Sequence, residues 1–429
     1  MSKYTADFNF DNIGQILLDY VCWILYEADK RGIRRLYFLA RDGYLLYQIA
    51  LKICREQSLS IQCRYLYCSR MALRLPSYHL IGDEAYELLT LGSYRPTMRS
   101  LLDRIQLSDS QRAAVYNVLD FPMEREDRQM NYSEFAVLTK RLKDCPLYRK
   151  LVHEKSEQAY PKAIGYLKQE GLLEQPCVAV VDSGWTGTMQ RSLRQLLASA
   201  GFKGTLVGFY FGMFQFQKRE PADGEFCCWY FSPDSASLNK LLFSNNLFEC
   251  LLSAPHGMTL GYAKEGDSFA PVLNPKPSPN MMRLVSLQIR SVLDYAEKQI
   301  CGMDIKAFQP KAARRRSEHL VRRLMAWPTR EEVQFYSQFL FCDDLSDKHP
   351  LSLAAPQQLA LLHDNYLLLP RILRKITGRS KQHVNRDLFW PYGTAALAGS
   401  WWKRVWYGGN IFVWDYIKLI IASKNNGKP

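Results

Sequence analysis

The sequence predicts an α/β fold built on a parallel sheet, because two stretches repeat one order of features. FLARDGYLL (residues 38–46) and VAVVDSGWTGTM (178–189) each pass from an apolar strand through a short loop into a helix. The second strand is β-branched and almost uninterrupted, as in a central strand covered on both faces. A strand, a tight loop and a helix form the usual ligand-binding edge of such a sheet. We therefore expect the functional site at these loops.

The other strands and the helices beside them follow from hydrophobic periodicity. Apolar residues at helical spacing predict a first helix at 10–31, and then helices at 44–55 and 189–200. Short apolar runs rich in β-branched and aromatic residues predict the strands. These runs lie at 35–39, 62–68, 178–181, 205–213 and 226–231.

Two long segments are helical in pattern, and they divide the chain. Residues 80–172 are rich in leucine and charge, with breaks near Ser93-Tyr94, Phe121-Pro122 and Cys145-Pro146. The helical pattern returns from Met281, interrupted by Pro328 and by a loop at His349-Pro350. We expect an α/β core at 1–75 and 173–275, a helical insertion at 76–172, and a helical C-terminal region at 276–429.

Composition indicates a folded protein of a reducing compartment. The 429 residues are 47% hydrophobic and 13% aromatic, which is typical of a well-packed chain. The opening MSKYTADFNFDN has no basic start followed by an apolar core, and no apolar stretch reaches the roughly 20 residues that span a bilayer. Eleven cysteines form no CxxC pair and no zinc-ligand spacing. We expect a cytoplasmic protein.

The net charge of +14 is concentrated near the C-terminus. Residues 371–429 hold eleven Lys and Arg against two Asp, a net charge of +9. Trp and Tyr beside Lys and Arg are typical of an anionic lipid surface, and we expect peripheral attachment to the inner face of the cytoplasmic membrane. A packed helix with solvated lysines is the alternative, and nucleic acid is not expected as a partner. The aromatic residues are Trp390, Trp401, Trp402, Trp406, Tyr407, Trp414 and Tyr416.

The loop after the 178–181 strand has the composition of an anion site. Its glycines let backbone N–H groups approach a phosphate, its hydroxyls add donors, and the following helix N-terminus adds partial positive charge. Asp182 can accept hydrogen bonds from sugar hydroxyls or hold a metal through water. An ordinary turn with an N-cap threonine is the alternative. The loop residues are Ser183, Gly184, Trp185, Thr186, Gly187 and Thr188.

Two other loops carry arginines directly after strands. Arg41, Asp42 and Gly43 follow the strand at 35–39, and the CSRMALR segment supplies further donors after the strand at 62–68. If the three strands are neighbours, their loops converge on one edge and suit a ligand with phosphates at two ends and a sugar between. Solvated surface arginines are the alternative. The donors of CSRMALR are Ser69, Arg70 and Arg74.

The segment NNLFECLLSAPHGMTLGY (245–262) supplies the remaining candidates. Glu249 and His256 are polar residues in an apolar setting. A carboxylate or an imidazole can serve as the general base for an acceptor hydroxyl. A helix-end glutamate and a loop histidine are the alternative interpretation.

These motifs resemble a known family. VAVVDSGWTGTM, its helix and the TLVGFYFG strand look like the phosphoribosyl-diphosphate motif of type I phosphoribosyltransferases. The set FLARDG, YLYCSR and DSGWTGT more closely resembles bacterial phosphoribosyltransferases that build ribofuranose into capsule and O-antigen glycans. This chain departs from the motif in its single acid before Ser183, its shorter loop and Trp185. A haloacid-dehalogenase phosphatase is disfavoured because Ala40 would stand in the nucleophile's place.

The resemblance implies a phosphoribosyltransferase-like core and a magnesium-dependent, inverting transfer. Ribose 5-phosphate would pass from phosphoribosyl diphosphate to a sugar hydroxyl of a lipid-linked glycan, and a companion phosphatase would then leave β-ribofuranose. Thr186, Gly187 and Thr188 would hold the 5-phosphate and Asp182 the ribose hydroxyls, with Mg²⁺ through water. The pyrophosphate would bind Arg41, Arg70 and Arg74 with the metal. Asp42 or Glu249 would act as the base, with His256 on the acceptor side. A non-catalytic sensor of a phosphosugar or nucleotide is the alternative.

Overall fold

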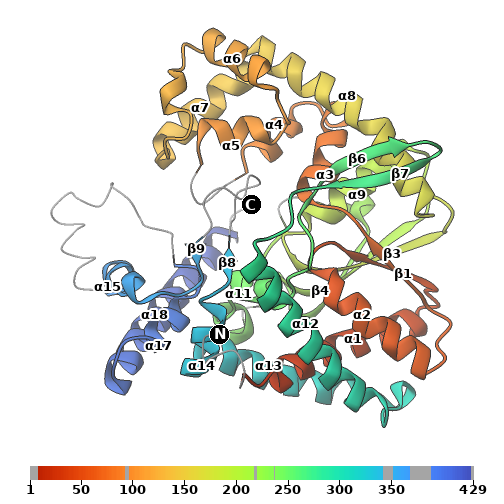
Figure 1. The fold of residues 1–429 in the computed structure, drawn as a ribbon, viewed down its shortest axis with the longest axis vertical. Coiled ribbons are helices and arrows are strands. Elements are labelled where there is room, and N and C mark those ends of the chain that lie inside the picture. Colours follow the sequence, from red (N-terminus) through yellow and green to blue (C-terminus); the bar gives the residue numbers. More distant parts are fainter. Residues whose placement is uncertain are drawn as a thin grey trace.

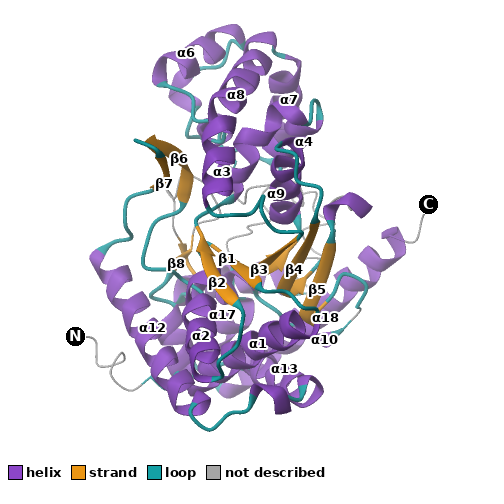
Figure 2. Cartoon of the chain, turned by 90° about the vertical axis from the view of Figure 1, so that its right-hand side faces the viewer, coloured by secondary structure: helices purple, strands orange, loops and turns teal. Residues whose placement is uncertain are grey.

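The computed structural model describes residues 8–91, 96–216, 220–235, 237–341, 351–367 and 388–426. Its centre is a five-stranded, all-parallel sheet of strand order β2-β1-β3-β4-β5 (Figures 1 and 2). The predicted α/β class with a parallel sheet is confirmed. The strands are β1 (Arg35–Leu39), β2 (Gln62–Leu66), β3 (Cys177–Trp185), β4 (Thr205–Met213) and β5 (Glu225–Phe231).

Helices cover both faces of this sheet, which explains the uninterrupted apolar strands. On one face, Phe38 and Val181 pack in a cluster with residues of α1, α2, α12 and α13. On the other face, Tyr37 and Val180 pack with residues of α8 and α9, beside α3 (Figure 2). Alternate strand residues thus enter two separate cores. The helices are α1 (Asp11–Lys30), α2 (Gly43–Glu56), α3 (Arg70–Arg74), α8 (Pro146–Gln169), α9 (Thr188–Ser199), α12 (Pro279–Ile300) and α13 (Pro310–Ala326).

The segment between β2 and β3 forms a helical unit with its own apolar cluster. Helical breaks are present at Phe121-Pro122 and at Cys145-Pro146, as expected, whereas the break expected at Ser93-Tyr94 lies outside the described residues. Short helices precede α8 in the order η1 (Leu75–Leu80), α4 (Glu84–Leu89), α5 (Met98–Asp103), α6 (Asp109–Val118), η2 (Met123–Arg125) and α7 (Tyr132–Asp144).

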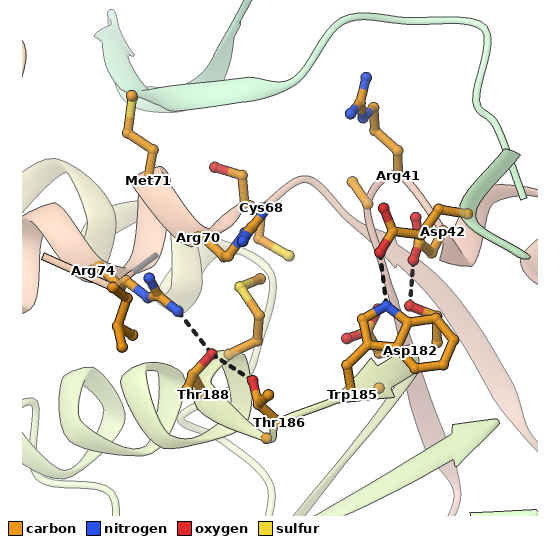
Figure 3. Close-up of a pocket in the computed structure, with 18 of the residues that line it drawn as sticks. Arg41, Asp42, Cys68, Arg70, Met71, Arg74, Asp182, Trp185, Thr186 and Thr188 are labelled. Carbon is orange, nitrogen blue, oxygen red and sulfur yellow. Dashed lines mark hydrogen bonds between the residues drawn. The ribbon is translucent and has the colours of Figure 1, made fainter. Parts of the chain in front are cut away.

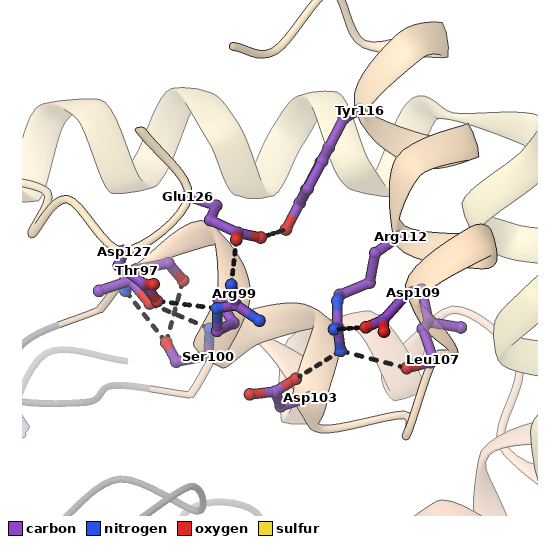
Figure 4. A network of polar contacts seen from close by, with 10 residues as sticks. All are labelled: Thr97, Arg99, Ser100, Asp103, Leu107, Asp109, Arg112, Tyr116, Glu126 and Asp127. Carbon is purple, nitrogen blue, oxygen red and sulfur yellow. Dashed lines mark hydrogen bonds and ion pairs between the residues drawn. The ribbon is translucent and has the colours of Figure 1, made fainter. Parts of the chain in front are cut away.

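A polar network holds the short helices of this unit together (Figure 4). Glu126 accepts hydrogen bonds from Arg99 of α5 and from the Tyr116 hydroxyl of α6, the latter over 2.6 Å. Arg99 also reaches Asp127 over 2.9 Å. One carboxylate therefore joins two helices to the turn after η2, which helps to fix helices too short to be stable alone.

An antiparallel hairpin was not expected from the sequence. It pairs β6 (Thr259–Glu265) with β7 (Ser268–Leu273) and packs on α8 and α3. β3 also runs four residues further than predicted. Short elements complete this part of the chain: η3 (Pro221–Asp223), α10 (Leu238–Leu241) and α11 (Asn245–Leu251).

The C-terminal region is mostly helical, as predicted, and its first helices belong to the main core through contacts of α12 and α13 with α1. The predicted His349-Pro350 loop and residues 368–387 lie outside the described part of the chain. None of the helices in the described part combines the length and hydrophobicity needed to cross a membrane. The remaining elements are η4 (Ile305–Ala307), α14 (Arg330–Tyr336), β8 (Leu340–Phe341), β9 (Leu351–Ser352), η5 (Pro356–Gln358), α15 (Leu359–Tyr366), α17 (Pro391–Ala396) and α18 (Trp401–Asn426).

Candidate functional site

The three loops converge, because β1 lies between β2 and β3 in the sheet. Together with the helical insertion and α11 they line a cleft of about 450 Å³ at the carboxyl edge of the strands. This is the expected place for a ligand in an open α/β sheet. The predicted residues that line it are Arg41, Asp42, Ser69, Arg70, Arg74, Asp182, Ser183, Gly184, Trp185, Thr186, Gly187, Thr188 and Glu249.

The loop after β3 is shorter than the sequence suggested. The region from Asp182 to Trp185 was predicted as loop, but it continues β3 and pairs with β4 as far as Met213. Gly184 permits this, because its φ is +118° and an added Cβ would lie 2.2 Å from the Gly212 carbonyl oxygen. Gly187, with φ +72°, is the N-cap of α9. Only two residues, Thr186 and Gly187, therefore connect strand to helix.

One end of the cleft is strongly positive (Figure 3). Arg74 donates a 2.8 Å hydrogen bond to the Thr188 hydroxyl, whose oxygen lies 3.5 Å from that of Thr186. Arg74 is only 9% exposed, and its Nε has no hydrogen-bond partner among the described residues. Burial, together with the nearby charges of Arg70 and Arg104, lowers the pKa of Arg74 to about 10. Three clustered guanidinium groups beside a hydroxyl loop favour an anion.

The sequence grouped Arg74 with the arginines expected to bind pyrophosphate. The structure places Arg74, the last residue of α3, beside Thr188 of the hydroxyl loop, because α3 packs against α9. Arg41, on the loop after β1, lies at the other side of the cleft in Figure 3. Arg74 therefore lies at the Thr186–Thr188 end of the cleft.

The other end of the cleft gathers carboxylates. Asp42 accepts a hydrogen bond from the Ser183 hydroxyl, which ties the end of β1 to the end of β3. Burial raises the pKa of Asp42 and raises that of Asp182 strongly, and the Asp182 pKa is raised further by the charges of Asp42 and Glu249. Two carboxyl groups with raised pKa values in one cleft are typical of proton transfer or of binding a cation.

Trp185 and Glu249 form a fixed pair at this carboxylate end. The Trp185 backbone has φ +83°, and its indole Nε1 donates to Glu249 Oε1 over 2.7 Å. The indole ring packs against Phe214, Phe243 and Phe248. Trp185, one of the positions at which the chain departs from the motif it resembles, therefore orients Glu249, one of the two predicted bases.

Two predicted residues, Ser69 and Gly43, have structural roles beside the cleft. Ser69 is the N-cap of α3, accepting from the Ala72 N–H and donating to the Thr259 carbonyl over 2.5 Å. Gly43 begins α2 and does not line the cleft; an added Cβ there would lie 2.7 Å from the Phe38 carbonyl carbon.

His256 was expected on the acceptor side, but it does not line the cleft. Its Nδ1 lies 2.8 Å from the Gly257 carbonyl oxygen and its Nε2 lies 2.7 Å from the Tyr65 hydroxyl. The carbonyl requires a donor, so Nδ1 carries the proton and Nε2 of the neutral ring accepts from Tyr65. Burial lowers the pKa of His256, which favours this neutral form. Both ring nitrogens are therefore engaged in holding the loop.

Within the described residues, no group of three or more His, Cys, Asp or Glu is arranged to hold a metal ion. Mg²⁺ is commonly held by one or two carboxylates together with substrate phosphates and water. Asp42 and Asp182 could hold Mg²⁺ in this way, because both are buried carboxyl groups and the charge of Asp42 raises the pKa of Asp182. The side chains are suited to a cation that arrives with a phosphorylated ligand.

Sequence reasoning missed the contribution of the helical insertion. Tyr78, Leu88, Leu91 and Arg104 line the cleft opposite the sheet edge. Arg104 is 9% exposed and donates to the Leu89 and Leu91 carbonyl groups over 2.5 and 2.8 Å. No local motif marks these residues, because only the tertiary fold brings them to the loops.

A scan against protein-family models finds no match for this chain, and neither does a search of curated proteins. The fold and the site define an α/β protein with a charged cleft at the carboxyl edge of a parallel sheet. The cleft has an arginine and hydroxyl end and a carboxylate end, and the function must be argued from this arrangement.

Proposed function

We propose that this chain is a phosphoribosyltransferase with a phosphoribosyltransferase-like core. It transfers ribose 5-phosphate from phosphoribosyl diphosphate to a sugar hydroxyl of a bacterial polysaccharide. The observation that carries the proposal is the polarity of the cleft, in which Arg74, Thr186 and Thr188 lie at one end and Asp42 and Asp182 at the other. A ligand with a phosphate at one end, a sugar in the middle and a cation-bound pyrophosphate beside Arg41 at the other end matches these groups.

The side chains at each end of the cleft indicate which part of phosphoribosyl diphosphate binds there. The 5-phosphate binds the Thr186 and Thr188 hydroxyls and the α9 N-terminus, with Arg74 and Arg104 supplying positive charge. The ribose hydroxyls donate to Asp182. The pyrophosphate binds Arg41 and Arg70.

Mg²⁺ accompanies the donor in this proposal. Asp182 holds it through water, and when bound it neutralises charge on the pyrophosphate. The buried carboxyl groups of Asp42 and Asp182 support this proposal, because a bound cation would offset the repulsion from Asp42 that contributes to the raised pKa of Asp182.

The transfer breaks the bond between ribose C1 and pyrophosphate and forms a bond from C1 to the acceptor oxygen. Arg41 and Arg70 stabilise the negative charge that develops on the leaving group. The acceptor oxygen attacks C1 from the face opposite the leaving group, which gives inversion. The acceptor proton passes to Asp42 or to Glu249. The product keeps its 5-phosphate, so a separate phosphatase must act to leave β-ribofuranose. A lipid-linked glycan is the proposed acceptor.

The test is incubation of purified protein with phosphoribosyl diphosphate, Mg²⁺ and a panel of lipid-mimic glycans. Release of pyrophosphate together with an acceptor mass increase of one pentose phosphate is the expected result. A panel of broad sugar composition that yields neither product would reject the enzyme.

A non-catalytic sensor of a phosphosugar or nucleotide is the second candidate. It is favoured by the short loop, which begins only after Trp185 because β3 remains paired with β4. Calorimetry with phosphoribosyl diphosphate separates the two functions. Binding without pyrophosphate release under any acceptor supports the sensor, whereas metal-dependent release excludes it.

A further inference from the structure

Helix α18 exposes an apolar stripe along one side of the molecule, at its lower left in Figure 1. Trp402 is 75% exposed, Trp406 52%, Val413 45% and Tyr416 49%. With exposed Gly409 between them, these positions are separated by three or four residues and so share one helix face. Trp401, Val405 and Phe412 are also exposed and widen the stripe.

The opposite side of α18 is anchored to the body of the protein. Ile411 is fully buried and packs with Leu362 and Ala395 of neighbouring helices. Arg404 donates to the Pro328 carbonyl over 2.6 Å and stacks on the Trp327 ring at 4.2 Å. The helix is therefore fixed in orientation, and its apolar stripe faces outward. A contiguous exposed apolar patch is typical of an interaction surface.

Charge and residue type indicate what binds this stripe. Lys403 is exposed beside the tryptophans, and the 371–429 segment as a whole carries +9. Indole and phenol rings next to Lys and Arg match the interface between lipid headgroups and acyl chains. A second copy of this chain would bring like charges together, which disfavours self-association through the stripe.

We propose that α18 lies flat on an anionic lipid bilayer, with Trp402, Trp406, Val413 and Tyr416 inserted among the headgroups. The exposed Lys403 and Lys418 of α18 attract the anionic surface, and the stripe adds apolar burial. Attachment is peripheral and weakens as salt rises. This binding does not depend on the catalytic proposal.

The experiment is flotation of the full chain with phosphatidylserine-containing vesicles and with phosphatidylcholine vesicles. We expect flotation with the first and about tenfold weaker partition with the second. The variant Trp402→Ser/Trp406→Ser/Val413→Ser should also lose about tenfold or more on anionic vesicles. Its control is Val118→Ser/Met123→Ser/Val137→Ser, which removes equally exposed apolar side chains from the insertion and should float like the wild type.

Two results overturn the proposal. One is wild-type protein that stays in the dense fraction with both vesicle types, or that floats equally with both. The other is a lipid-free dimer, measured by light scattering, that the stripe variant converts to a monomer, because the occupant would then be a second copy. Circular dichroism establishes that the variant is folded. Its pyrophosphate release with a soluble acceptor reports on the catalytic proposal separately.

Discussion

The indole Nε1–H of Trp185 donates a 2.7 Å hydrogen bond to Oε1 of Glu249, joining the end of β3 to α11. The φ of +83° at Trp185 turns the side chain toward α11, and three phenylalanines hold the ring in place. Trp185 thus sets the position and hydrogen bonding of the Glu249 carboxylate. It is a positioning residue in the proposed reaction.

Trp185→Phe removes this hydrogen bond and keeps an aromatic ring. We expect kcat to fall by about tenfold or more, the effect of losing a hydrogen bond to a charged group, with little change in the KM for phosphoribosyl diphosphate. Adding Glu249→Gln to Trp185→Phe should reduce kcat less than the two single effects combined, since both act through one carboxylate. Independent, fully additive losses would show that Trp185 supports only the fold.

Asp182→Asn and Arg41→Ala should each reduce transfer by at least about 100-fold. The first variant loses a contact to the ribose, and the second loses the positive charge that stabilises the leaving pyrophosphate. Arg41 is exposed, and the asparagine has nearly the shape of aspartate, so neither change opens a core cavity. Rates are measured by pyrophosphate release, and thermal unfolding checks the fold. Near-normal turnover in either variant would remove that residue from the proposed active site.

The buried carboxyl pair makes stability depend on pH. Burial raises the pKa of both Asp42 and Asp182 above the ordinary 3.8. A carboxyl whose pKa is raised by folding contributes stability that is fully present below its unfolded-state pKa, and this stability is lost as pH rises through the folded-state value. Both groups therefore cost stability at neutral pH.

Asp182→Asn cannot ionise, so it should raise the Tm at neutral pH, by about 1–3 °C for a chain of this length. The difference should vanish only below pH 3.8, where Asp182 is protonated in both the folded and the unfolded wild-type chain. Calorimetry across this range is the measurement, with Asp267→Asn, at the exposed turn of the β6–β7 hairpin, as the control. If Asp182→Asn is less stable than the wild type at neutral pH, the ionised Asp182 carboxylate does not destabilise the fold, and the prediction is wrong.

The convergence of the three loops was predictable because it depends on the succession of strand, loop and helix along the sequence. Each strand is followed at once by its loop and helix, and parallel neighbours end at one edge of the sheet. β1, at Arg35–Leu39, has the predicted limits, and β2 starts at the predicted Gln62. A short apolar run bounded by a loop is enough to locate a strand such as β1, which is buried along nearly its whole length.

The features that the sequence did not reveal depend on contacts between distant residues. β3 extends to Trp185 because Gly184 lies against Gly212 of the neighbouring strand, whereas in the sequence Gly184 looks like part of a loop. The β6–β7 hairpin is short and partly exposed, so its alternation is weak. Arg104 reaches the cleft only through the packing of the insertion.

Arg104 gives the sharpest test of the phosphate end of the cleft. Its guanidinium supports the Leu89 and Leu91 carbonyl groups, and its charge acts on Arg74 beside Thr188. If it also attracts the 5-phosphate, Arg104→Gln should weaken binding of ribose 5-phosphate by about tenfold, the effect of losing one charge-assisted contact. Binding of pyrophosphate should change little, whereas Arg41→Ala should weaken binding of pyrophosphate and leave binding of ribose 5-phosphate nearly unchanged.

Arg104→Lys keeps the charge and should restore most of the ribose 5-phosphate affinity. Calorimetry measures both ligands, and thermal unfolding measures the loss of carbonyl contacts. A lower Tm with both affinities unchanged would make Arg104 a structural residue of the insertion alone.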